Sequence, residues 1–228
     1  MKNSKFSRFT TPSVFKNITI TIAIGHLFLM PPILLSQNTA RYWFEKGLAE
    51  TNLVKKVAFY DAAIRLDPTL DVAYGNRGYI QVQLGKTPEA MSDYNKAIEL
   101  NPKFASVFHN RGALKNELGR FSDALTDLTK AISLKPNERV YQDRGKVNFN
   151  LQHYQDAVHD YSMSIQIFRK KIDYAFEIDA SSQEISHLES ALAYVFFYRS
   201  GAFEKLGQST NAKKDLEIYN TLITTYRY

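Results

Sequence analysis

The sequence predicts an all-α protein, built from antiparallel helix pairs that stack in chain order behind an N-terminal leader. Three observations lead to this prediction. A short motif recurs at a nearly constant interval, amphipathic segments of helical length lie between its copies, and a basic segment followed by an apolar one opens the chain. With 228 residues, the chain can hold the three or more repeats that such a stack needs for stability.

Residues 1–37 form the leader. Its first part carries basic side chains and no acidic one, and an uncharged, largely apolar run follows from Ile18 to Leu35. This order is typical of an export signal peptide, and the run is also just long enough for a short membrane-spanning anchor. Both interpretations predict an exported protein, which is periplasmic, secreted or associated with a membrane through the leader. The alternative is a cytoplasmic protein with a buried N-terminal helix.

The charge of the chain excludes one class of partner. The net charge of +6 comes from 29 basic and 23 acidic residues, and four of the basic residues belong to the leader: Lys2, Lys5, Arg8 and Lys16. Without these four, the remainder is nearly balanced in charge, so we expect no nucleic-acid partner. The chain has no cysteine, which excludes disulfides, thiolate zinc sites and a cysteine nucleophile.

The repeated motif is an aromatic residue followed four positions later by glycine, with arginine just before the glycine. Its three glycines, Gly78, Gly112 and Gly145, recur at intervals of about 34 residues. An alanine follows each glycine at a constant distance and a large apolar residue stands one helical turn further on, while prolines recur at the same interval as the glycines: Ala90, Ala124, Ala157; Tyr94, Leu128, Tyr161; Pro68, Pro102, Pro136. The glycine and the alanine are small enough to let two helices approach closely.

Each unit is predicted to contain two helices. In the second unit, residues 74–84 have one apolar stripe, and Gly85 has the position of a helix-ending glycine. Thr87 is predicted to cap the next helix, with Pro88 at its first position, and that helix runs to Leu100.

These motifs resemble the tetratricopeptide repeat. Three copies match its pattern: Tyr74, Gly78, Ala90, Tyr94, Pro102; Phe108, Gly112, Ala124, Leu128, Pro136; and Tyr141, Gly145, Ala157, Tyr161 without the proline. Two degenerate copies flank them: Trp43, Gly47, Tyr60, Ala63, Pro68; and Phe196, Arg199, Ser200, Gly207, Ala212, Leu216. The resemblance implies a right-handed superhelical stack, a tetratricopeptide repeat solenoid, that binds a protein or peptide in a concave groove. Residues 38–168 are then four helix pairs, the first of them degenerate.

Residues 169–228 contain an insertion and a degenerate last repeat or cap. The separation of Arg144 and Arg199 exceeds one repeat by about 21 residues, and the extra residues lie at about 169–190. We expect two helices that extend beyond the repeat length, with a break at residues 180–182 and Ser181 or Ser182 as the cap. The insertion is either a lengthened C-terminal cap or a partner-binding protrusion.

Four arginines on first helices precede four aspartates on second helices, always at the same separation along the chain. The pairs are Arg77 with Asp93, Arg111 with Asp127, Arg144 with Asp160, and Arg199 with Asp215. This spacing predicts structural ion pairs that join helices, within a repeat or to its neighbour. A row of arginines that faces the groove and collects acidic groups of a ligand is the functional alternative.

The groove residues follow from the resemblance alone. By the phasing of the family, the groove is lined by Val72, Gly75, Tyr79, Val82, Gln83, His109, Ala113, Asn116, Glu117, Arg139, Gln142, Lys146, Phe149 and Asn150. This surface is apolar at its first end and more polar or basic at the other, which suits an extended peptide or a helix with apolar anchors.

Motifs for chemistry are missing from the sequence. It contains no phosphate-binding glycine loop, nucleophile elbow or HExxH motif. His153, Asp156 and Asp160 share a helix face, but we interpret this face as solvated and expect neither a metal nor a cofactor. The sequence therefore predicts a non-enzymatic scaffold for protein–protein interaction. The alternative is a structural or assembly subunit of a membrane-associated protein complex.

Overall fold

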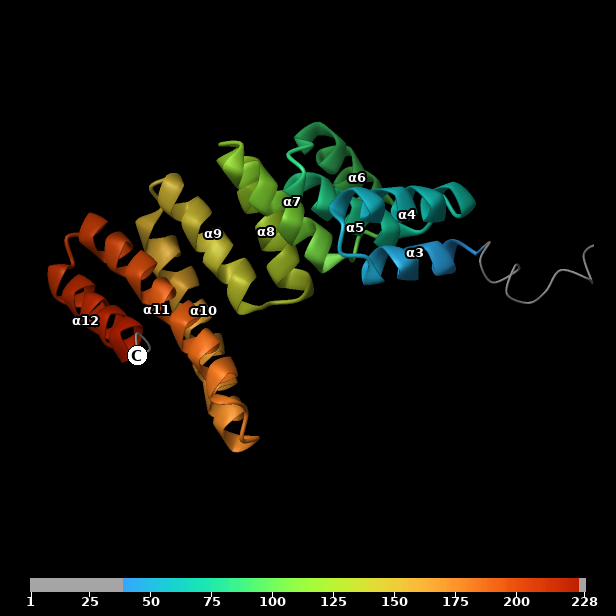
Figure 1. Ribbon diagram of the computed structural model, residues 1–228. Coiled ribbons are helices and arrows are strands. Elements are labelled where there is room, and N and C mark those ends of the chain that lie inside the picture. Colours follow the sequence, from blue (N-terminus) through green and yellow to red (C-terminus); the bar gives the residue numbers. More distant parts are fainter. Residues whose placement is uncertain (1–38, 226–228) are drawn as a thin grey trace, which may run out of the picture. The chain divides into compact units, whose positions relative to one another are not determined.

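The computed structural model describes residues 39–225, and this part of the chain contains ten α-helices and no strand (Figure 1). The helices are α3 (Ala40–Ala49), α4 (Leu53–Leu66), α5 (Asp71–Gln83), α6 (Thr87–Leu100), α7 (Ala105–Glu117), α8 (Phe121–Leu134), α9 (Glu138–Asn150), α10 (Tyr154–Glu177), α11 (Ser182–Lys205) and α12 (Ser209–Thr225). The leader predicted at residues 1–37 lies outside the described residues. Within residues 39–225, none of the helices combines the length and the apolar character that crossing a membrane requires.

The chain divides into two compact units, one ending at Pro68 and the other beginning at Thr69. In the first unit, α3 and α4 form a helix pair. Thr39 caps α3 by accepting a hydrogen bond from the Tyr42 amide at 3.1 Å. The ring of Tyr60 occupies the space where a side chain at position 47 would stand, so Gly47 lets the two helices approach.

In the second unit, α5 to α12 form four helix pairs that follow one another in chain order (Figure 1). The same packing recurs in three of them. On α6, α8 and α10 the large residues Tyr94, Leu128 and Tyr161 are buried, and each fills the space beside the glycine of its partner helix. Burial raises the pKa of both tyrosines above its ordinary value.

The turn inside each of the four pairs formed by α5 to α12 has one residue whose backbone lies in the left-handed region of φ and ψ. Gly85, Gly119 and Gly207 supply it with φ near 72°. The pair formed by α9 and α10 has Gln152 there with φ 63°, so the stack forces a non-glycine residue into the same turn.

The predicted cap at Thr87 is wrong by one residue. Helix α6 begins at Thr87 because the carbonyl of Lys86 already accepts the hydrogen bond from the Ala90 amide, at 3.0 Å.

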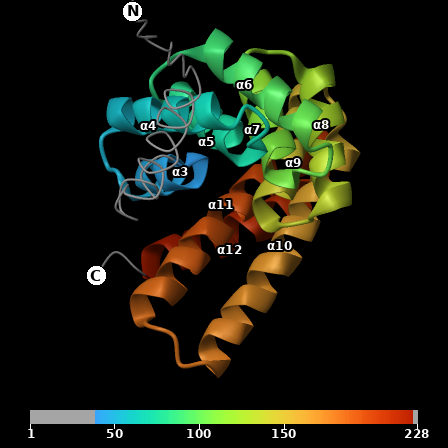
Figure 2. The ribbon, with the colours of Figure 1, turned by 90° about the vertical axis from the view of Figure 1, so that its right-hand side faces the viewer.

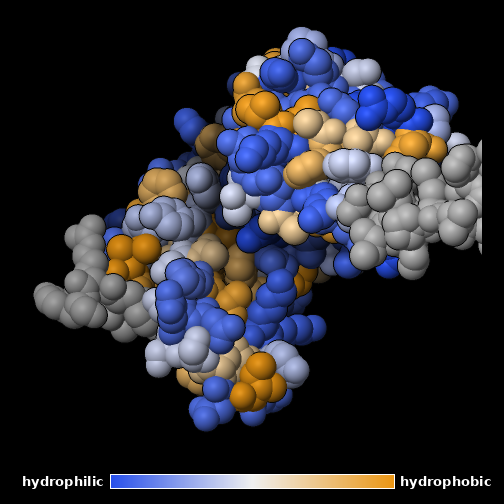
Figure 3. Space-filling view, turned by 45° about the vertical axis from the view of Figure 1, so that its right-hand side comes forward, coloured by the Kyte–Doolittle hydropathy of each residue, from blue (hydrophilic) through white to orange (hydrophobic). Residues whose placement is uncertain are grey.

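Helices α10 and α11 are each 24 residues long, whereas α5 to α9 have 13 or 14. Their adjoining ends project beyond the neighbouring helices in both ribbon views (Figures 1 and 2). Ser181 caps α11, and its hydroxyl and amide exchange hydrogen bonds with Glu184 in a capping box. The projecting end exposes the apolar side chains Tyr174, Phe176 and Ile178, and hydrophobic surface appears in the lower part of the space-filling view (Figure 3).

Candidate functional site

All four arginines form two-point ion pairs with the aspartates predicted as their partners. Each Nε donates to one carboxylate oxygen at 2.8–3.0 Å and each Nη2 to the other at 2.6–2.8 Å. The aspartate side chains are only 1–7% exposed and those of the arginines 16–19%. Each guanidinium also lies 5.3–5.8 Å from the ring of the aromatic residue three positions earlier.

Three of these arginines also reach the preceding repeat. The Nη1 of Arg111 donates to Asn95 at 2.7 Å, and that of Arg199 donates to Ser162 at 2.9 Å. The Nη1 of Arg144 lies 3.4 Å from Thr129. The acceptors stand on α6, α10 and α8, the second helices of the preceding pairs. The pairing therefore acts both within a repeat and across its boundary, and these guanidinium groups serve helix packing rather than a row of free charges for a ligand.

The residues predicted to line the groove stand on α5, α7 and α9, the first helices of their pairs; with α11 these helices form what we call the first-helix face. Most of the predicted side chains are accessible. Tyr79, Gln83, Glu117, Arg139 and Asn150 are exposed, and Val72, Val82, His109, Ala113, Asn116, Gln142, Lys146 and Phe149 are partly exposed.

Gly75 is the exception, because it is buried against α7. A Cβ there would lie 2.9 Å from Val107 and 3.3 Å from Phe104. Its role is to let two first helices pack closely, and it adds no surface to a groove.

Residues one repeat apart meet on this face. His109 Nε2 lies 2.8 Å from Asp143 Oδ2, and Lys146 Nζ lies 3.1 Å from Asp143 Oδ1. Asn150 donates to Asn116 at 3.2 Å. Burial by itself would raise the pKa of the Asp143 carboxyl, but the hydrogen bond from His109 and the charge of Lys146 hold that pKa below its ordinary value. The first helices α7 and α9 are thus joined by a polar strip.

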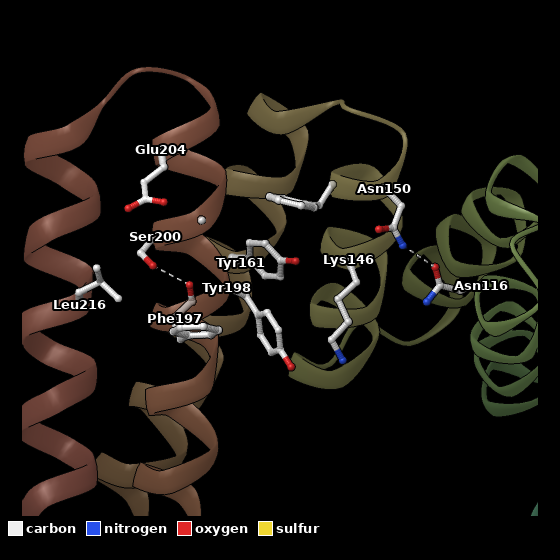
Figure 4. A pocket seen from close by; sticks show the side chains of 11 residues that line it. Asn116, Lys146, Asn150, Tyr161, Phe197, Tyr198, Ser200, Glu204 and Leu216 are labelled. Atoms are coloured by element: carbon white, nitrogen blue, oxygen red, sulfur yellow. Dashed lines mark hydrogen bonds between the residues drawn. The ribbon is translucent and has the colours of Figure 1, made fainter.

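A pocket of about 480 Å³ opens beside this strip, between α9 and α11 (Figure 4). Four of the predicted groove residues line it: Asn116, Lys146, Phe149 and Asn150. The other lining residues are Tyr161, Phe197, Tyr198, Ser200, Gly201, Glu204 and Leu216. The Nζ of Lys146 lies 5.3 Å from the centre of the Tyr198 ring. Aromatic rings thus form much of the wall, and amide and charged groups stand at its edge.

Sequence reasoning missed the part of the pocket that α11 and α12 contribute. The insertion interrupts the period, so family phasing could not be extended to α11. One signal was available in the sequence. Gly201 follows Ser200, which occupies the small packing position of its repeat, so the chain has a second small residue that the packing does not need.

The face with His153, Asp156 and His159 belongs to a smaller pocket of about 240 Å³. Asp160 accepts hydrogen bonds there from Arg144 and Asn148. In the described part of the chain, no three His, Asp or Glu side chains are arranged to hold a metal ion.

Fold and site together define a helical-repeat protein whose first helices present an accessible face with a pocket. Two models of the tetratricopeptide repeat match the chain, one over residues 72–104 and the other over residues 93–126. The protein is a tetratricopeptide repeat protein.

Solved structures share this fold. A MamA protein crystal structure is 16% identical, with a TM-score of 0.63 over 86% of this chain and 95% of that one. MamA from Desulfovibrio magneticus RS-1, residues 41 to the end, is 12% identical, with a TM-score of 0.63 over 83% and 96%. YrrB, described as a tetratricopeptide repeat protein with an unusual peptide-binding site, is 19% identical, with a TM-score of 0.64 over 86% and 92%. A sequence search of curated proteins gives no match.

Proposed function

We propose that this protein is a non-enzymatic scaffold that binds a segment of a partner protein on its first-helix face. The pocket between α9 and α11 is the observation that carries the proposal. It combines apolar walls with a few polar groups at the edge, as ligand sites in proteins generally do. The peptide-binding site named for YrrB, which has the same fold, supports the same use of this chain.

The chemistry of the pocket supports binding rather than catalysis. Its one hydroxyl from a serine, that of Ser200, donates to the carbonyl of Phe197 at 2.7 Å. A serine nucleophile requires instead a base that accepts its proton. Asn116 and Asn150 offer amide groups, which bind without transferring protons.

In-cell photocrosslinking of the full-length protein tests the proposal. A photoreactive amino acid replaces Asn150, which is exposed at the pocket, or Lys130, which is exposed on α8 and serves as the matched control. We expect a discrete protein adduct from position 150 and none from position 130. Equal labelling from both positions, or no adduct from either, would contradict the proposal.

We further propose that the protein is exported. The leader supports this proposal through its four basic residues and the apolar run from Ile18 to Leu35. Mass spectrometry of the mature N-terminus in cell fractions provides the test. Cleavage near the end of the apolar run, or an intact chain in the membrane fraction, supports export. An intact chain in the soluble cytoplasm contradicts it.

A second candidate function is that of an assembly subunit in a membrane-associated complex. The projecting end of α10 favours it, because Tyr174, Phe176 and Ile178 are 57–61% exposed there. Apolar side chains gathered on a surface often mark a contact with another protein. Co-sedimentation of the full-length protein with a complex of fixed stoichiometry supports this function, and its loss on replacing all three residues by serine would locate the contact.

A further inference from the structure

We propose that the pocket between α9 and α11 receives one large apolar side chain of the partner segment, and that a basic residue of that segment lies next to it on Glu204. This inference rests on the proposed function, since it specifies the chemistry of the segment that the scaffold binds. It follows from three features of the pocket: a glycine with open space beside it, a pair of amide groups, and a carboxylate without an ion-pair partner.

Gly201 is the first feature. Beside the helical glycines Gly78, Gly112 and Gly145, the large residue of the partner helix occupies the space. A Cβ added at these glycines would lie 2.7–2.9 Å from that residue. At Gly201 the nearest atom to an added Cβ is Phe149 Cε2 at 3.9 Å, which is an ordinary contact distance. Glycine inside a helix destabilises a protein by about 1 kcal/mol relative to alanine. Helix packing does not explain Gly201, whereas keeping the pocket open does.

The walls around this space are suited to an apolar side chain. The rings of Phe149 on α9 and of Phe197 and Tyr198 on α11 line the pocket. Figure 4 shows the rings of Phe197 and Tyr198 on the α11 side. Phe197 is 47% exposed and Tyr198 37%, so both rings have apolar surface that an incoming side chain can cover. Covering such surface is the main favourable term in most protein associations.

The amide pair is the second feature. Asn150 Nδ2 donates to Asn116 Oδ1. The other two polar groups of this pair, Asn116 Nδ2 and Asn150 Oδ1, have no hydrogen-bond partner among the described residues. They offer one donor and one acceptor, which a peptide unit can match with its carbonyl and its amide. The edge of the pocket can therefore hold the backbone that carries the anchor.

Glu204 is the third feature. Its carboxylate is exposed at the edge of the pocket and forms no ion pair with any residue in the range 39–225. The carboxylate of Asp143, by contrast, is paired with Lys146 and His109. The charge that a ligand can still neutralise is thus negative, which selects a Lys or Arg beside the anchor.

Peptide selection tests the inference. Random dodecapeptides displayed on phage are selected on the full-length protein, and the enriched peptides are synthesised for fluorescence anisotropy. We expect a recurrent Phe, Trp, Leu or Met with a Lys or Arg nearby. Gly201→Leu, whose side chain fills the pocket, should weaken binding about 10- to 100-fold. Gly201→Ala adds a single methyl group and should weaken binding much less than Gly201→Leu does. Glu204→Gln should weaken binding and reduce its dependence on salt.

The outcomes separate this inference from the proposed function. Peptides without a recurrent apolar residue, or equal affinity for the wild type and Gly201→Leu, overturn the anchor and leave the scaffold function standing. No enrichment at all overturns both. If circular dichroism shows that Gly201→Leu is unfolded, Phe197→Ala takes its place, because it removes an exposed wall of the pocket.

Discussion

Arg144 and Asp160 are joined by two parallel hydrogen bonds, from Nε to Oδ2 at 3.0 Å and from Nη2 to Oδ1 at 2.6 Å. The carboxylate is 1% exposed and has no lysine partner among residues 39–225; its third hydrogen bond comes from Asn148. The equivalent Asp127 binds Arg111 and also Lys115, whose Nζ lies 2.7 Å away. The two sites therefore differ in what remains when the arginine is removed.

This difference predicts unequal losses of stability. Arg144→Ala should lower the free energy of unfolding by about 3–5 kcal/mol, because it leaves a buried charge without an ionic partner. Arg111→Ala should lower it by at least about 1 kcal/mol less, since Lys115 still neutralises Asp127. Urea unfolding at pH 7 measures both variants. Equal losses would contradict the role given to Lys115, and no loss in either would contradict a structural role for the pairs.

A turn mutation should stabilise the protein. Gln152 has φ 63°, where Gly85 and Gly119 stand in the equivalent turns with φ 72°. Gln152→Gly relieves the left-handed strain, and the greater freedom of glycine in the unfolded chain offsets part of the gain. We expect a net increase of up to about 1 kcal/mol in the free energy of unfolding. Gly119→Gln is the reciprocal control and should lower the free energy of unfolding by a comparable amount. Thermal melts of both variants provide the measurement.

Two glycine-to-alanine changes should act in opposite directions. At Gly145 an added Cβ would lie 2.7 Å from the buried ring of Tyr161, so Gly145→Ala should lower stability by about 1–3 kcal/mol. At Gly201 there is room, and Gly201→Ala should raise stability by about 0.5–1 kcal/mol. Melting temperatures of the two variants check this contrast. A destabilised Gly201→Ala would mean that the glycine has a packing role.

The polar strip should make stability depend on pH in the acid range. The pKa of Asp143 is lower in the folded protein than its ordinary value, so its contribution is present above that ordinary value, near 4, and is lost as the pH falls through the folded-state pKa. Asp143→Asn should therefore cost about 0.5–1.5 kcal/mol at pH 7 and progressively less from pH 4 downward. Denaturant titrations at several pH values provide the measurement, and a cost that does not change with pH would contradict the ionic role.

Much of the fold could be predicted from local spacing. The regular period, the small residues and the constant separation of Arg and Asp all report contacts between neighbouring helices, which repeat along the sequence because the same helix pair is built again. The left-handed turn at Gln152 could not be predicted from composition, because the strain is imposed by the packing on either side of it. The start of α6 at Thr87 was likewise set by the carbonyl of Lys86, which no residue preference reveals.

By itself, the sequence determined the repeat architecture and the ion pairs that join helices within each pair, because these depend on residues at fixed separations along the chain. Only the tertiary structure decided that Gly75 is buried by α7, and that Arg111, Arg144 and Arg199 also bind the preceding repeat. It also decided the pocket, whose walls on α9 and α11 are brought together across the insertion. The physical reason is that such contacts depend on how helices pack in space, and an insertion breaks the period by which sequence spacing could have located them.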